Sequence, residues 1–136
     1  MIGLGIFSME IKTLEHLRNY CANKAGAKEA FPFDSKTLVF KVMNKMFALC
    51  NIEAEELKVN LKCRPEFAEL LREKYDSIVP GYHMNKKHWN TVTIDGSIPN
   101  DELLYLIDHS YELVVKSLTK ANREMLAHRD YLNNLE

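Results

Sequence analysis

The stretch LKVNLKC at residues 57–63 decides the fold, because it is the most regular strand pattern in the chain. Its apolar positions are Leu57, Val59, Leu61 and Cys63. Its polar positions are Lys58, Asn60 and Lys62, none of which is acidic. Successive side chains of a strand point to opposite faces of a sheet, so the alternation predicts a sheet with one buried face and one open polar face.

Other segments have the composition of neighbouring strands. β-Branched and aromatic side chains predict a strand at residues 37–43, residues 46–52 are expected to return as its partner, and residues 89–94 also read as a strand. Residues 29–33 are expected to form a short strand or an extended turn. Pro32 limits this segment to an edge of the sheet. Asn44 and Lys45 predict a tight turn between the strands at 37–43 and 46–52, because asparagine tolerates a positive φ. Lys41 and Lys36 are expected to join the lysines of the open face.

Three segments have helical patterns. Apolar residues recurring at steps of three and four predict helices at residues 9–23, 65–75 and 99–126. Ser8 is expected to cap the first helix, and Pro65 suits the first turn of the second. The predicted order is one helix, three or four antiparallel strands, a helix, a strand and a helix. We therefore expect an α+β domain, with about five antiparallel strands and helices packed on one face.

Length and composition fit one domain covering residues 1–136. We expect residues 1–8 to be an N-terminal extension, with Met1 and Met9 as alternative starts, and residues 127–136 to be a frayed tail. The apolar opening is too short to span a membrane and lacks the features of a secretory signal. Cysteines at three unpaired positions, Cys21, Cys50 and Cys63, indicate reduced thiols in a cytoplasmic protein.

The stretch PGYHMNKKHWNTV at residues 80–92 is the most distinctive part of the chain. It contains the only tryptophan, two of the five histidines and a Lys-Lys pair, and no acid. Pro80 and Gly81 predict a turn. Cationic groups, rings and amides on a loop that enters a strand suit an anionic or nucleic-acid ligand. The alternative is a structural loop in which Trp89 and Tyr82 fill the core.

This stretch, with several shorter ones, resembles the MmcQ/YjbR family of small bacterial proteins, which are described as double-wing DNA-binding proteins. The shorter stretches are AFPF at 30–33, VFKV at 39–42, KMFA at 45–48, LK at 61–62, RPE at 64–66, IP at 98–99, DEL at 101–103 and SY at 110–111. The resemblance covers roughly residues 11–123. It implies the same α+β arrangement, with a CyaY-like fold, and a role in DNA binding.

The formal net charge is −1, so nucleic-acid binding needs a local basic face. We expect the open sheet face to contact phosphates, and the turn at residues 44–45 and the loop at residues 82–90 to act as the two wings. Rings in the loop would stack on bases, and its asparagines would read base edges. The candidate residues are Lys41, Lys45, Lys58, Lys62, Tyr82, His83, Asn85, Lys86, Lys87, His88, Trp89 and Asn90. The expected partner is DNA, favoured as the duplex and bound weakly or without sequence specificity.

The same residues leave two other functions open. A protein-binding or chaperone-like module would use the same sheet face, and a metal or small-ligand module is the third reading. His83 and His88 with Cys63 do not have a recognised zinc spacing, and the acidic residues 53–56 suit a solvated turn. The chain has no GxxxxGK[ST], GxGxxG, nucleophile-elbow or HExxH motif. We therefore expect no enzyme activity, no cofactor and no metal.

Overall fold

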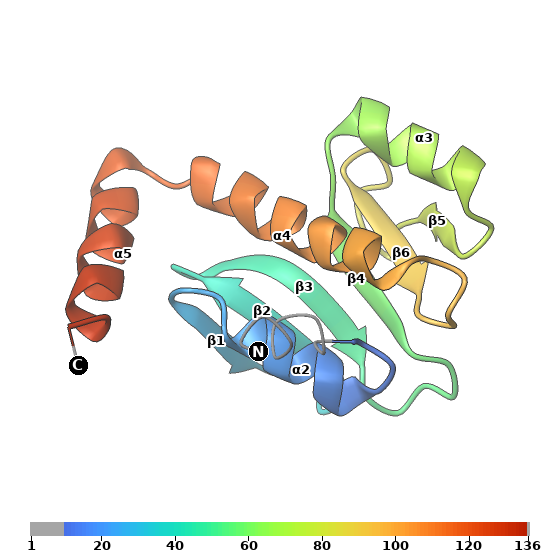
Figure 1. Ribbon diagram of the computed structural model, residues 1–136, viewed down its shortest axis with the longest axis horizontal. Helices are drawn as coiled ribbons and strands as arrows, with labels where there is room; N and C mark the ends of the chain where they lie inside the picture. Colours follow the sequence, from blue (N-terminus) through green and yellow to red (C-terminus); the bar gives the residue numbers. More distant parts are fainter. Residues whose placement is uncertain (1–9, 136) are drawn as a thin grey trace, which may run out of the picture.

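A computed structural model describes residues 10–135 and shows a six-stranded antiparallel sheet in the order β1-β2-β3-β4-β6-β5. The strands are β1 (Ala27–Ala30), β2 (Thr37–Val42), β3 (Lys45–Asn51), β4 (Lys58–Lys62), β5 (Ile78–Pro80) and β6 (Trp89–Thr93). The helices in the described part are α2 (Leu14–Ala22), α3 (Pro65–Lys74), α4 (Asn100–Lys116) and α5 (Lys120–Asn133). Helices α2 and α4 cross the same face of the sheet (Figure 1). The predicted α+β class is confirmed, with one more strand than expected.

Strand β4 lies inside the sheet, as its alternating pattern predicted. It pairs with β3 on one side and with β6 on the other. Val59 and Leu61 are buried against the helices, whereas Lys58 and Lys62 point to the opposite face. Lys62 is paired with Trp89, so these two side chains share that outer face.

The β2–β3 hairpin turns one residue earlier than predicted. Met43 and Asn44 have φ angles of 48° and 70°, and the last pair before the turn is Val42 with Lys45. Positive φ at both central residues is typical of a type I′ turn, whose twist suits a two-residue hairpin. Met43 is therefore a turn residue and not the end of a strand.

Two edge elements differ from the sequence-based expectation. β1 begins at Ala27 and ends before Pro32, which lies in the connection to β2. β5 was not predicted at all, because three residues ending in a proline give no periodic pattern. It pairs with β6 at the opposite edge of the sheet.

Several helices begin or end at other residues than the sequence predicted. α2 begins at Leu14, where the side chain of Thr13 accepts a hydrogen bond from the His16 amide at 3.2 Å. The predicted Ser8 cap and the N-terminal extension lie outside the described residues. The predicted helix at 99–126 is two helices, since α4 ends at Lys116 and Thr119 caps α5 by accepting from the Asn122 amide at 3.1 Å. Residues 127–133 continue α5 and are not frayed.

The main core lies between the sheet and the helices. It includes Phe40 and Phe47 from the β2–β3 hairpin, Leu17 from α2 and Ile107 from α4. Ser110 of α4 joins this core to the sheet, because its hydroxyl donates to the Phe47 carbonyl at 2.6 Å and accepts from the Lys62 amide at 2.8 Å. The hydroxyl thus replaces a direct strand-to-strand hydrogen bond between β3 and β4.

A second, smaller hydrophobic cluster lies on the outer face. Val39, Leu49 and Trp89 are buried there, and Met46 and Met84 pack against them. Met84 belongs to the loop that precedes β6, so this loop covers part of the face that was expected to be open. In the described part of the chain, no helix is both long and apolar enough to cross a membrane.

Candidate nucleic-acid interface

The outer face of the sheet presents lysines and no acid at its strand positions. The side chains of Lys41 and Leu49 point to this face, and so do those of the residues paired with them on neighbouring strands. Alternation along β4 places Lys58 and Lys62 on the same face as Asn60, which is paired with Leu49. The charged members of this face are Lys28, Lys41, Lys58 and Lys62. Glu29, the acid on these strands, has the opposite orientation and pairs with Arg18 of α2 at 2.7 Å. We call these four lysines the lysine face.

Charge on the lysine face is not uniform. Lys28 lies directly opposite Lys41 in the β1–β2 ladder, and Lys62 lies opposite Trp89 at the same end of the sheet. None of these three ammonium groups makes an ion pair within residues 10–135. Lys58, at the other end of β4, is 3.7 Å from a Glu56 carboxylate oxygen. Unneutralised charge therefore concentrates at the end of the sheet next to the loop before β6.

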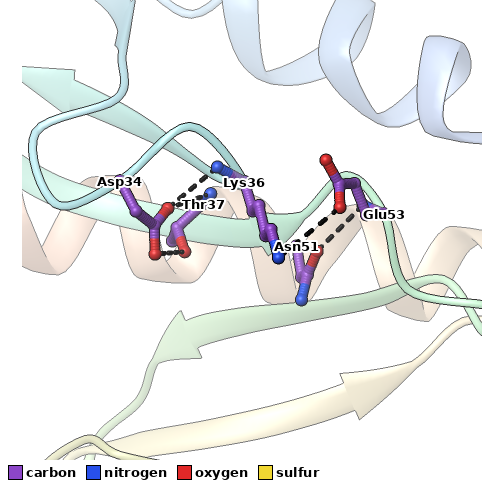
Figure 2. Close-up of polar contacts among 5 residues, drawn as sticks. All are labelled: Asp34, Lys36, Thr37, Asn51 and Glu53. Atoms are coloured by element: carbon purple, nitrogen blue, oxygen red, sulfur yellow. Dashed lines mark hydrogen bonds and ion pairs between the residues drawn. The ribbon is translucent and has the colours of Figure 1, made fainter.

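Lys36 is also neutralised and does not extend the lysine face. Its ammonium group is 3.8 Å from a Glu53 carboxylate oxygen. Figure 2 shows how the two backbones are fixed: Asp34 accepts from the amides of Lys36 and Thr37 at 2.9 and 2.7 Å, and Asn51 accepts from the Glu53 amide at 2.8 Å. The acidic turn at residues 53–56 thus cancels positive charge at this end of the sheet.

Arg72 of α3 holds the loop between β5 and β6. Its Nε donates to the Asn90 side-chain oxygen at 2.6 Å, and its guanidinium also donates to the carbonyls of Lys86 and Trp89. Within the loop, the Lys86 ammonium group donates to the Gly81 carbonyl at 2.9 Å. These bonds give the loop a defined shape even though it contains no regular secondary structure.

Two rings of this loop are presented to solvent. Tyr82 is 69% exposed, and its ring centroid lies 4.0 Å from that of His83, whose φ of 59° is left-handed. The Asn85 side-chain oxygen accepts from the Lys87 amide at 2.9 Å, so this asparagine shapes the loop. His88 is half-buried, and its carbonyl accepts from the Cys63 amide at 2.8 Å. Tyr82, His83, Asn85, Lys86 and Lys87 are therefore the exposed members of the predicted loop site.

Three predicted site residues are not available at this surface. Trp89 is only 9% exposed and belongs to the cluster with Val39 and Leu49, so its ring does not face a base. Asn90 is 2% exposed and points to the helix side, where it is bound by Arg72. Lys45 also turns to the helix side, and its ammonium group donates to the Ser117 carbonyl at 3.2 Å.

The two predicted wings do lie at the same end of the sheet. The hairpin turn follows Lys41 and precedes Met46, and the loop enters β6 opposite Lys62. The structure adds two residues that the sequence did not point to. Lys28 precedes the strand predicted at 29–33, so its face was unknown, and Arg72 has the ordinary appearance of a charged helix residue.

The next question is whether residues near this face could bind a metal ion or react through a thiol. Across residues 10–135 there is no group of three or more histidines, cysteines, aspartates or glutamates placed to hold a metal ion. Cys63 is buried, and burial raises the pKa of its thiol to about 11 even though Arg64 and Arg72 act in the opposite direction. The thiolate, which is the form that binds metals and attacks electrophiles, is therefore disfavoured.

Comparisons with known proteins give a consistent result. A model of the YjbR family matches residues 22–113. YjbR of Escherichia coli K12 is 39% identical over 114 residues, covering 84% of this chain and 97% of that protein. YbdF of Escherichia coli O157:H7 is 39% identical over 94 residues, covering 69% of this chain and 77% of that protein.

Solved structures show the same likeness. The crystal structure of Deinococcus radiodurans DR2400 has a TM-score of 0.80 at 46% identity, covering 88% of this chain and 89% of that one. A Pseudomonas syringae protein has a TM-score of 0.66 at 29% identity, covering 75% of this chain and 98% of that one.

Proposed function

This chain belongs to the YjbR family, and on that basis we propose that it is a cytoplasmic DNA-binding protein, and not an enzyme, which holds duplex DNA weakly and without sequence specificity. The observation that carries the proposal is the lysine face, where outward strand positions contain four lysines and no acid in a chain whose net charge is −1. Such a separation of charge creates the local basic surface that phosphate binding requires.

Phosphate contacts would come from the unpaired end of the lysine face. Lys28, Lys41 and Lys62 are free of ion pairs among the described residues, and Lys87 of the loop lies exposed at the same end. Each neutralised phosphate releases condensed counterions, so binding should weaken with salt by a slope of about −0.9 for each contact. Three to four contacts predict a slope of roughly −3 to −4.

The loop would add contacts of a second kind. Tyr82 and His83 are exposed rings held by a loop that Arg72 fixes from behind. On a duplex they would contact the sugar–phosphate backbone, whereas on an unpaired strand they would stack on bases for about 1–3 kcal/mol per base. With Asn90 buried, the described loop offers Asn85 as its remaining amide, which supports a surface that reads little sequence.

The test is binding of a fluorescent random duplex across a series of salt concentrations. We expect Lys41→Glu/Lys62→Glu to weaken binding at least tenfold at low salt and to flatten the salt slope. The matched control is Lys12→Glu/Lys116→Glu, which makes the same charge change at exposed residues on the helix side and should bind far more like the wild type. Equal losses in both variants, or no binding by the wild type, would reject the proposal.

One observation favours a second candidate, a protein-binding module that uses the same face. This face also has exposed apolar surface at its β5 edge, where Val79 is 46% exposed. Such a surface would keep a protein partner at high salt, where DNA is released. Recovery of one specific protein from cell extract at high salt, lost in a Val79→Asp variant, would favour this candidate over DNA.

A further inference from the structure

Helix α5 is attached to the domain along one side only. Its one buried side chain in the described part is Leu126, which lies over Gly26 and Val42. Figure 1 shows α5 at one end of the molecule, beyond the end of α4 and far from α3 and β5. The family match ends at residue 113, so α5 also lies beyond the segment that the family model describes.

The opposite side of α5 has an exposed stripe of four apolar residues and one histidine. Its members recur at steps of four, three and four residues within the helix and then three to the next leucine: Ala121, Met125, His128, Leu132 and Leu135. All are exposed; Met125 is 45% exposed, Leu132 is 46% and Leu135 is 64%. This is the spacing of the seam of a coiled coil, and at 100° per residue Leu126 lies well off the stripe, toward the domain.

Charges beside the stripe indicate what covers it. When Met125 and Leu132 occupy the a positions of a heptad, Glu124 is at g and Arg129 is at the following e position. In a parallel pair of helices a g residue lies beside the next e residue of the other chain. Glu124 would therefore lie beside the partner's Arg129, and two-fold symmetry repeats this pair of opposite charges. Neither residue has an ion pair within residues 10–135, so both are available.

We propose that a second copy of this chain covers the stripe, so that two α5 helices pack in parallel as a short coiled coil. The complementary charges come from one and the same helix, which favours a second copy over an unrelated partner. Two heptads bury little area, so the association is weak and depends on protein concentration. The inference is independent of DNA binding and uses a surface on a different part of the molecule.

The experiment is sedimentation equilibrium of the full chain over a wide concentration range, up to about 1 mM, which covers weak dissociation constants. The wild type should dimerise reversibly. Leu132→Asp should abolish dimerisation while circular dichroism stays native, because this side chain is exposed in the monomer. Glu124→Arg and Arg129→Glu should each weaken the dimer roughly tenfold, because each variant brings like charges together twice.

An equimolar mixture of Glu124→Arg and Arg129→Glu should recover the wild-type affinity, because the mixed dimer again pairs opposite charges. The control Glu112→Arg makes the same charge change at an exposed position of α4 and should leave dimerisation unchanged. Oxidised Met125→Cys should also form a disulfide-linked dimer, since native Cys21, Cys50 and Cys63 are buried.

Three results would overturn the proposal. A chain that is monomeric at every concentration has no such interface. A dimer that survives Leu132→Asp uses another surface. A dimer that Leu132→Asp abolishes, but that is not restored by mixing the two charge variants, does not have the parallel register.

Discussion

At the scale of single residues, Trp89 is the most informative side chain. It lies on the outer face of the sheet, yet it is 9% exposed because Val39, Leu49 and Met84 surround it. The indole therefore stabilises the loop against the sheet and does not serve as an exposed stacking platform. Stacking, if the loop contacts unpaired bases, would fall to Tyr82 and His83.

Trp89→Ala should lower the free energy of unfolding by about 3–5 kcal/mol, because the substitution empties a site on which the loop and two strands pack. Urea unfolding followed by circular dichroism measures this change. The matched control is Tyr82→Ala, which removes an aromatic ring that is 69% exposed and should change stability little. Equal stabilities for the Trp89 variant and the wild type would show that the outer cluster contributes nothing.

His109 should make the fold sensitive to mild acid. It is buried between the rings of Phe67 and Tyr105, and its Nε2 accepts from the Arg64 amide at 3.3 Å. Burial is the main cause that lowers its pKa, Arg64 and Lys116 lower it further, and Glu112 acts in the opposite direction. The unfolded chain thus binds this proton more readily than the folded chain.

The neutral, buried ring of His109 therefore contributes fully to the free energy of unfolding above the unfolded pKa of about 6.5. This contribution is lost as the pH falls below that value. We expect the free energy of unfolding to decline between pH 7 and pH 5, and His109→Gln to flatten that decline. His83→Gln, at an exposed histidine, should leave the decline intact. A decline of the same size in the His109 variant would contradict this assignment.

At the scale of elements, β3 and β4 depend on a hydroxyl supplied by α4. The Ser110 hydroxyl occupies the gap between the Lys62 amide and the Phe47 carbonyl, and it is completely buried. The helix thereby completes the hydrogen bonding of the sheet that it covers. Removing this hydroxyl takes away a hydrogen-bond partner from the buried Phe47 carbonyl and from the partly buried Lys62 amide.

Ser110→Ala should lower the free energy of unfolding by roughly 2–4 kcal/mol, since a buried unsatisfied group costs about 1–3 kcal/mol. It should also accelerate hydrogen exchange at the Lys62 amide more than at the Leu61 amide. Ser35→Ala, which removes an exposed hydroxyl, is the matched control and should leave both quantities unchanged. Wild-type exchange at Lys62 in the Ser110 variant would contradict the bridging role.

The sequence predicted helices and strands correctly where burial imposes a regular spacing of apolar residues. It did not predict the elements whose existence or ends depend on contacts with distant parts of the chain. The alternation around Val59 and Leu61 gave β4, because one face of that strand is buried and the other is not. The break between α4 and α5 contains neither proline nor glycine. The chain is interrupted there because Leu118 is buried and Thr119 caps the start of α5. β5 is three residues long, so its existence depends on pairing with β6.

The candidate site was also predicted only in part. The lysines of β4 follow from its alternation, whereas Asn90 was misassigned because both faces of β6 are buried and a one-residue choice of register decides its direction. The neutralisation of Lys58 by Glu56 and of Lys36 by Glu53 depends on side-chain placement. Opposite charges near each other in sequence gave no indication of which lysines would remain unpaired.

At the scale of the whole molecule, one continuous core joins every layer. Buried residues from α2, α3, α4 and α5 and from β2 to β6 form a single cluster on the helix side. The three buried cysteines lie in different parts of this core, because Cys21 is in α2, Cys50 is in β3 and Cys63 follows β4. A core of this kind favours cooperative unfolding of the domain.

All three thiols should therefore react with a thiol reagent at one slow rate, set by global unfolding. Burial is the main cause that raises their pKa values, to about 12 for Cys21 and about 11 for Cys50 and Cys63, so both access and thiolate content are low in the folded state. Labelling followed by mass spectrometry measures each rate, and denaturant should release all three together. Fast labelling of a single cysteine would instead reveal a locally opening segment.

The position of Trp89 has one more consequence. The chain contains a single tryptophan, and it lies beneath the loop and beside Lys62 on the proposed contact surface. Its emission spectrum is thus a built-in optical reporter: loosening of the loop should shift the emission to longer wavelength, and a molecule docking over the sheet should change its intensity. Ligands of unlabelled protein can be screened by this signal alone.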